Sequence, residues 1–139
     1  MSLCAPAGRL SARVSAFGSG SLDAVGGEVR RVLLSVASPS IGVQRRRAQR
    51  APFPHLVRLE AVDPATLVPV DEPLVVVGKH LSEQGLGFFH PVPLAHRFVI
   101  ATLDVNDGRP ARLLVDVSWC RFTRLGWYES GGRFLRVVE

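Results

Sequence analysis

Arginine is concentrated in one short segment of this chain, Arg45-Arg46-Arg47-Ala48-Gln49-Arg50. A guanidinium group stays charged, donates two parallel hydrogen bonds to a phosphate, pairs with O6 and N7 of guanine, and stacks on a flat base. Arginine also supplies almost all of the net charge of +5, since Lys79 is the only lysine. The cluster therefore predicts a phosphate-bearing partner, and the alternative is a solvated basic linker.

A second polar segment, His80-Leu81-Ser82-Glu83-Gln84-Gly85, follows an apolar run that has the character of a strand. The Ser82 hydroxyl is suited to bond a base edge or a phosphate, and Gly85 allows positive φ or the close approach of a ligand. Neutral His80 offers one acceptor nitrogen and a flat ring. Serine and glycine also occur in ordinary turns, so this segment points to a binding site only in combination with the arginine cluster.

The two segments together resemble the PilZ domain family, bacterial receptor modules for cyclic di-GMP with the motifs R-x-x-x-R and D/N-x-S-x-x-G. The matching positions are Arg46 and Arg50, extended by Arg45, in the first motif, and Ser82 and Gly85 in the second, where His80 replaces Asp or Asn. A closing pattern of the family is matched by Val117, Trp119, Tyr128, Gly131, Gly132 and Phe134. The resemblance extends from Arg45 to the C-terminus and implies a six-stranded antiparallel β-barrel.

The same resemblance implies a cyclic di-GMP receptor that is not an enzyme and needs no other cofactor. Its ligand-binding residues would be Arg45, Arg46, Arg50, His80, Ser82 and Gly85. Ligand binding would fold the arginine segment onto the barrel, reposition residues 1–41 and signal to an unidentified protein partner. Two alternatives stay open: a divergent PilZ fold that binds protein and no nucleotide, and, less favoured, a basic β domain that binds nucleic acid.

The elements that would position these side chains follow from the spacing of apolar residues. Apolar residues from Leu22 to Val36 recur at helical intervals, which predicts a short helix with Ser21 as N-cap. Gly26 and Gly27 weaken its first turns, so a start after these two glycines is the alternative. We expect residues 1–41 to form a partly disordered arm containing this helix, and residues 42–139 to form the barrel domain with the arginine-rich loop.

From Pro52 onward the apolar residues alternate with polar ones, as in strands with one buried face. Strands are predicted at about 57–61, 74–77, 86–89, 99–105, 113–119, 127–129 and 134–138. Asn106-Asp107-Gly108 is a strong hairpin signal, and Ser130-Gly131-Gly132 is assigned to a second turn. Among the aromatic residues, alternation assigns Trp119 and Phe134 to the core in preference to a base-stacking surface.

Composition narrows the class of protein further. A chain of 139 residues is sufficient for one domain, and no apolar run approaches the roughly 20 residues of a membrane-spanning helix. The first 20 residues lack the apolar core of a secretory signal, so we expect a cytoplasmic protein. The two cysteines and four histidines show no metal-ligand spacing, and we expect neither metal, nor nucleic acid, nor membrane among its partners.

Overall fold

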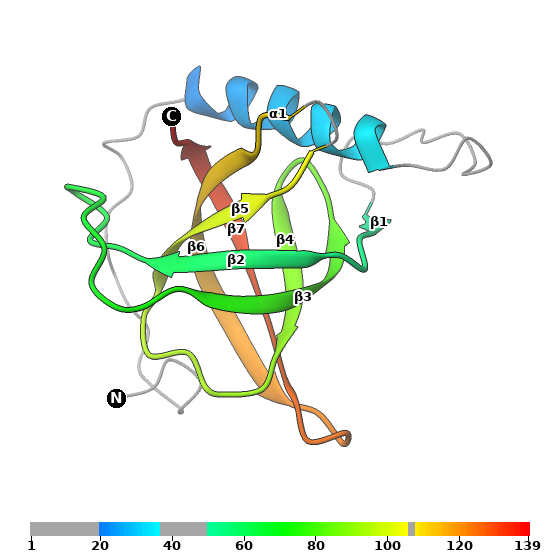
Figure 1. Ribbon diagram of the computed structural model, residues 1–139, viewed down its shortest axis with the longest axis vertical. Helices are drawn as coiled ribbons and strands as arrows, with labels where there is room; N and C mark the ends of the chain where they lie inside the picture. The colour runs from blue at the N-terminus through cyan, green and yellow to red at the C-terminus, as the bar shows by residue number, and fades with distance from the viewer. Residues whose placement is uncertain (1–19, 37–49, 106–107) are drawn as a thin grey trace.

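The strands of this protein form a closed antiparallel β-barrel with one helix across its end (Figure 1). The computed structural model describes residues 20–36, 50–105 and 108–139. Its elements in chain order are α1 (Gly20–Val36), β1 (Ala51–Pro52), β2 (Leu56–Ala61), β3 (Leu74–Leu81), β4 (Gly85–His90), β5 (Phe98–Leu103), β6 (Ala111–Phe122) and β7 (Tyr128–Val137). The predicted fold class is confirmed.

Closure of the barrel comes from pairing at both ends of the strand order. Strands β3, β2, β5, β6, β7 and β4 are neighbours in that order, and β3 also pairs with β4. Every pair is antiparallel. The two-residue strand β1 adds to β3 beside its C-terminal end, where Pro52 lies opposite His80. Because each of the six barrel strands is paired on both of its sides, the barrel formed by the described residues has no open sheet edge.

The barrel interior is filled by the apolar residues that alternate along the strands. Val57 and Leu59 of β2, Leu103 of β5 and Leu113 of β6 are at most 2% exposed. Phe88 of β4 and Phe134 of β7 are also fully buried. The predicted burial of Phe134 is therefore confirmed, and burial of these apolar side chains supplies the main driving force for folding.

The middle of β6 departs from simple alternation because it is buried on both faces. Leu114, which alternates with the inward-facing Leu113 and Val115, packs with Ile100 and Leu135 in a second apolar cluster on the outside of the barrel. The partly buried Leu67, in the connection between β2 and β3, packs against this cluster. Asp116 is 2% exposed and accepts two hydrogen bonds from Arg97, at 2.6 and 3.0 Å. A period-two pattern of apolar residues predicts one buried face of a strand and does not predict a second buried layer on the other face.

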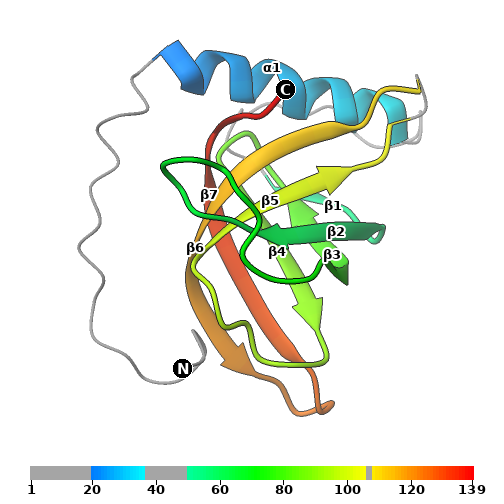
Figure 2. The same ribbon diagram turned by 60° about the vertical axis from the view of Figure 1, so that its left-hand side comes forward.

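Helix α1 covers one end of the barrel in both views (Figures 1 and 2). Val25, Val29 and Val32 recur at helical spacing, are at most 1% exposed, and belong to the barrel core cluster. The helix begins at Gly20, so Ser21 lies within it and is not its N-cap, and the alternative start after Gly27 is also wrong. Packing of the valine face offsets the weak helix propensity of the two glycines. No helix among the described residues has the length and apolarity required to cross a membrane.

The predicted turn at Ser130-Gly131-Gly132 is also wrong, because these residues lie within the ten-residue strand β7. The β6–β7 hairpin turns instead at residues 123–127, where Gly126 has φ +85°. The antiparallel β5–β6 pairing expected around Asn106-Asp107-Gly108 is confirmed, and Gly108 has φ +88°. Asn106 and Asp107 themselves lie outside the described residues. The glycines of β7 serve close packing between strands, as described below.

Candidate functional site

The predicted site residues that the structure describes share one hollow on the outer barrel surface. Its volume is about 260 Å³, and it lies over β3, β4, β7 and the middle of β6. It is lined by Arg50, His80, Ser82, Gln84, Gly85, Leu86, Gly87, Ser118, Trp119, Gly131, Gly132 and Arg133. Arg50, His80, Ser82 and Gly85 are thus brought together. Arg45 and Arg46 lie outside the described residues, as does the expected boundary at residue 41.

The floor of the hollow is one row of residues that runs across four neighbouring strands. His80 pairs with Gly87, Gly87 with Gly131, and Gly131 with Trp119. The register shifts between Gly78 and His80 on β3, and again between Val117 and Trp119 on β6. Such shifts mark β-bulges, which redirect the following side chain. Both ring-bearing residues of the row therefore stand immediately after a bulge.

Each ring lies over the glycine beside it. A Cβ atom on Gly131 would be 2.5–2.6 Å from three atoms of the Trp119 indole, and one on Gly87 would be 2.8–3.2 Å from three atoms of the His80 imidazole. Near-equal distances to several ring atoms mean that the ring presents its face to the glycine. Any other residue would occupy the space that the ring fills. The two rings therefore lie against the barrel wall as flat surfaces.

Trp119 is 41% exposed, so its assignment to the core is wrong. The bulge at Ser118 explains the difference, because the extra residue shifts the phase of alternation and brings Trp119 to the outer surface. Among the lining residues that sequence reasoning missed as site residues are Trp119, Gly87 and Arg133. The one available signal was the pair Gly131-Gly132, which marks close approach within a strand as well as a turn.

Ser82 and Gly85 form the tight connection between β3 and β4. The Ser82 hydroxyl oxygen accepts hydrogen bonds from the amides of Gln84 and Gly85, at 3.1 and 3.2 Å, and the Ser82 amide donates to Gly85 O at 3.0 Å. Ser82 is 7% exposed. Its hydroxyl hydrogen remains as a donor for a ligand. The turn therefore fixes the direction of the residues that rim the hollow.

Gly85 is required by the neighbouring strand. A Cβ at this position would meet the carbonyl oxygen of Gly132 at 2.2 Å, a distance that real Cβ atoms do not show. Gly85 is not among the glycines with positive φ, which in the described residues are Gly108 and Gly126. Its role is close contact between β4 and β7, in place of the expected positive φ.

The pKa of His80 lies below its ordinary value of 6.5. Partial burial is the largest cause, and the positive charges of Arg50 and Lys79 lower the pKa further, against a smaller opposing effect of Glu129. At pH 7 the imidazole is therefore neutral. It carries one nitrogen acceptor and one N–H donor, which is half the acceptor capacity that a carboxylate offers to the N1 and N2 donors of guanine.

The hollow carries positive charge on its rim. Arg50 and Arg133 are exposed and line it, and no Asp or Glu is among its described lining residues. The nearby carboxylate of Glu83 is directed to α1, where Arg30 Nη1 lies 2.9 Å from its Oε2 atom. Gly26 of α1 packs against the same side chain, since a Cβ there would be 3.1 Å from Glu83 Oε1. The turn that rims the hollow therefore touches the helix directly.

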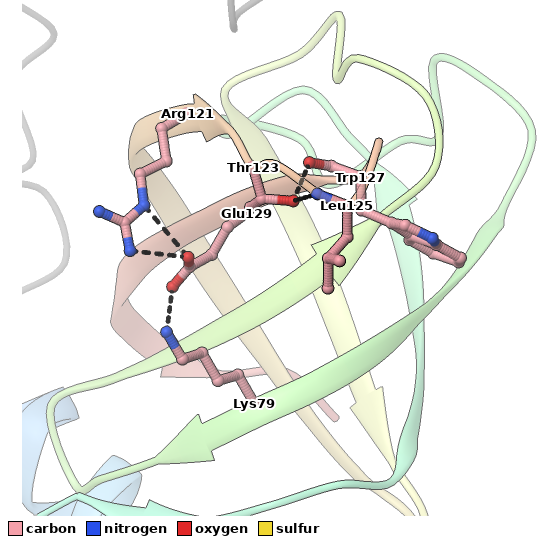
Figure 3. A network of polar contacts seen from close by, with 6 residues as sticks. All are labelled: Lys79, Arg121, Thr123, Leu125, Trp127 and Glu129. Atoms are coloured by element: carbon pink, nitrogen blue, oxygen red, sulfur yellow. Dashed lines mark hydrogen bonds and ion pairs between the residues drawn. The ribbon is translucent and has the colours of Figure 1, made fainter.

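A buried carboxylate lies in the next row of the same sheet face (Figure 3). Glu129 is 3% exposed; its Oε2 accepts from Lys79 Nζ at 2.5 Å, and its Oε1 accepts from Arg121 Nε and Nη2 at 3.1 and 2.9 Å. Burial raises the pKa of Glu129, but the hydrogen bonds and charges of Lys79 and Arg121 outweigh it and bring the pKa below the ordinary value. This ionised carboxylate holds β3, β7 and β6 together beside the hollow.

Chemically, the hollow combines the indole face of Trp119, the neutral imidazole of His80 and the guanidinium groups of Arg50 and Arg133. Within the described part of the chain, no group of three or more His, Cys, Asp or Glu side chains is arranged to hold a metal ion. Comparison with known proteins found no matching family model, no matching curated protein and no matching solved structure. The flat rings and the positive rim of the hollow suit a flat, anionic ligand.

Proposed function

We propose that this protein is a receptor for cyclic di-GMP, with a site of the PilZ type on the outside of the barrel. The observation that carries the proposal is the convergence of Arg50, His80, Ser82 and Gly85 in one hollow. These residues come from two segments that resemble the two sequence motifs of the PilZ family. The closed six-stranded barrel agrees with the fold that the same motifs imply.

The site chemistry matches the two parts of this ligand. Guanine is flat, and the exposed face of the Trp119 indole is a stacking surface for it. The phosphates are anionic, and Arg50 and Arg133 on the rim offer bidentate donors, to which the motif adds Arg45 and Arg46. Neutral His80 accepts one hydrogen bond from a guanine edge or stacks on the base.

The output of the receptor would pass through the turn between β3 and β4. Ligand held by Ser82 and Gln84 sits on one side of this turn, while Glu83 on the other side is paired with Arg30 and packed against Gly26 of α1. A shift of the turn on binding would therefore move or release the helix. Loss of the exposed ion pair alone is worth at most about 1 kcal/mol, so the packing against Gly26 contributes to the coupling.

Isothermal titration calorimetry with purified full-length chain tests the proposal, with cyclic di-AMP and GTP as control ligands. Cyclic di-GMP should bind saturably. Arg46→Ala and Arg50→Ala should each weaken binding about tenfold to a hundredfold, because each removes charge-assisted hydrogen bonds to phosphate. Arg58→Ala is the matched control, since Arg58 is an exposed arginine of β2 that does not line the hollow. Absence of heat at high micromolar ligand would reject the proposal.

A second candidate function is a protein-interaction module that has lost nucleotide binding. Two observations favour it: the Ser82 oxygen is already occupied by two backbone amides, and His80 stands where the family motif has a carboxylate or amide. A partner whose binding is unchanged by cyclic di-GMP and by Arg50→Ala would support this function. The same titration distinguishes the two candidates.

A further inference from the structure

The β6–β7 hairpin projects from the barrel at the end opposite α1 (Figures 1 and 2). Near its tip, Leu125 is 86% exposed, Phe122 64% and Trp127 39%. Single exposed apolar residues are common on protein surfaces. Three large ones within six consecutive residues concentrate exposed apolar side chains at the end of a projecting hairpin, as at a site of interaction.

This hairpin tip, residues 121–128, is held in a defined conformation by its own hydrogen bonds (Figure 3). The amide and hydroxyl of Thr123 both donate to Trp127 O at 2.8 Å, and the Leu125 amide donates to Thr123 Oγ1 at 3.3 Å. The ring of Phe122 meets that of Tyr128 edge-on, with centroids 5.1 Å apart. Leu125 is thus presented to solvent by an ordered turn, which reduces the entropic cost of docking.

The charges of the hairpin tip have one sign. Arg121 and Arg124 are exposed, and residues 121–128 contain no Asp or Glu. The adjacent Glu129 is 3% exposed and is shared between Arg121 and Lys79, so it presents no negative charge to the surface. Of these four charged groups three are positive and one is negative, which leaves the tip region with a net charge of +2.

We propose that the hairpin tip docks on the surface of an anionic lipid bilayer. A leucine and two aromatic rings at the end of a projecting element suit the boundary between lipid headgroups and acyl chains, where Trp and Tyr are favoured. Arg121 and Arg124 complement the negative headgroups. This proposal departs from the expectation from sequence that no membrane is among the partners. It is independent of cyclic di-GMP binding, because none of these residues lines the hollow.

Co-sedimentation of the full-length protein with vesicles tests the proposal. The protein should bind vesicles that contain phosphatidylcholine and phosphatidylserine. It should bind vesicles of phosphatidylcholine alone at least about tenfold more weakly, because each of the two arginines contributes about fivefold to binding of the anionic surface. Leu125→Asp should reduce binding to the anionic vesicles about tenfold or more. Leu34→Asp is the matched control: Leu34 is 81% exposed, lies on α1 at the other end of the molecule, and gives the same change in charge.

A second measurement reports insertion directly. In a Trp119→Phe background Trp127 is the sole tryptophan, and its emission should shift to the blue and be quenched by lipids brominated on the acyl chains. Equal binding to both vesicle types, equal loss in Leu125→Asp and Leu34→Asp, or no quenching would each overturn the proposal. If Leu125→Asp instead abolishes a dimer seen by light scattering and vesicles are not bound, the tip is a self-association surface and the lipid assignment is wrong.

Discussion

The two halves of the candidate site use the same construction for different chemistry. On β3 a bulge is followed by His80, whose ring lies on Gly87 of β4; on β6 a bulge is followed by Trp119, whose ring lies on Gly131 of β7. The histidine half titrates and is surrounded by the charges of Arg50 and Lys79. The Trp119 ring of the other half has no titratable group and presents a larger apolar face.

The position of each ring and the chemistry of each ring are therefore set by different residues. The bulge and the glycine fix where a flat ring lies, and the identity of the ring decides whether it accepts a hydrogen bond or only stacks. Changes to a glycine should therefore alter stability or ring position, and changes to a ring should alter ligand affinity. The predictions below separate these effects, in order of decreasing size.

The largest effect is expected from Gly132→Ala. A Cβ there would lie 2.3 Å from Asp116 O and 2.7 Å from Val117 Cα, which are backbone atoms that cannot move aside. The free energy of unfolding should fall by about 3 kcal/mol, measured by urea denaturation. Gly131→Ala is the control: the atoms nearest to its Cβ belong to the partly exposed Trp119 ring, which can swing away, so a loss below about 1 kcal/mol is expected. Equal losses would contradict this account.

The next effect concerns Trp119→Ala and cyclic di-GMP affinity. Loss of base stacking should weaken binding about tenfold to a hundredfold in calorimetry, as stacking contributes about 1–3 kcal/mol per base. Trp127→Ala is matched to it, since the two tryptophans are similarly exposed and Trp127 does not line the hollow. Affinity that drops equally in both variants would mean that Trp119 has no specific role in the site.

The smallest effect is the pH dependence that His80 imposes on binding. Because the pKa of His80 is lowered below 6.5, the imidazole is neutral at pH 7 and gains its proton as pH falls below 6.5. Protonation removes its acceptor, so affinity should fall several-fold between pH 7 and pH 5. His80→Asp should strengthen binding at pH 7 up to about tenfold and remove most of this dependence, because an ordinary aspartate stays ionised to about pH 4.

Affinity that rises on acidification would instead assign His80 to a phosphate. The stability of the protein also depends on the pH. The unfolded chain binds the proton at higher pH than the folded chain does, so lowering the pH below 6.5 destabilises the fold. Affinity should therefore be measured on protein shown to be folded at each pH.

Sequence patterns predicted the features that depend on neighbours along the chain. The alternation of Val57 and Leu59 and the helical spacing of Val25, Val29 and Val32 both report one buried face, and these residues are buried. The residues Arg50, His80, Ser82 and Gly85, which the resemblance to the PilZ family implied as site residues, lie in one hollow. Local periodicity predicted burial correctly wherever the pattern of buried residues kept one phase along the whole element.

Features that depend on contacts between distant strands were not predictable in this way. The bulge at Ser118 moved Trp119 from the expected core to the surface, and nothing in the alternation of β6 announces it. Gly131-Gly132 resembles a turn, but its lack of side chains serves the packing of Trp119 and of the Asp116 backbone. Leu114 is buried because a second apolar cluster forms outside the barrel. In each case tertiary packing overrode a local signal.

The row from His80 to Trp119 has a consequence for folding kinetics. Its central pair, Gly87 and Gly131, joins strands that are far apart in the chain, and contacts of this kind carry the largest loop-closure entropy. A ligand that contacts both rings spans the Gly87–Gly131 pair on the outer surface and so holds β4 and β7 together. Bound ligand would then slow the rate of unfolding. This effect would be measurable even where binding causes no detectable change in the shape of the protein.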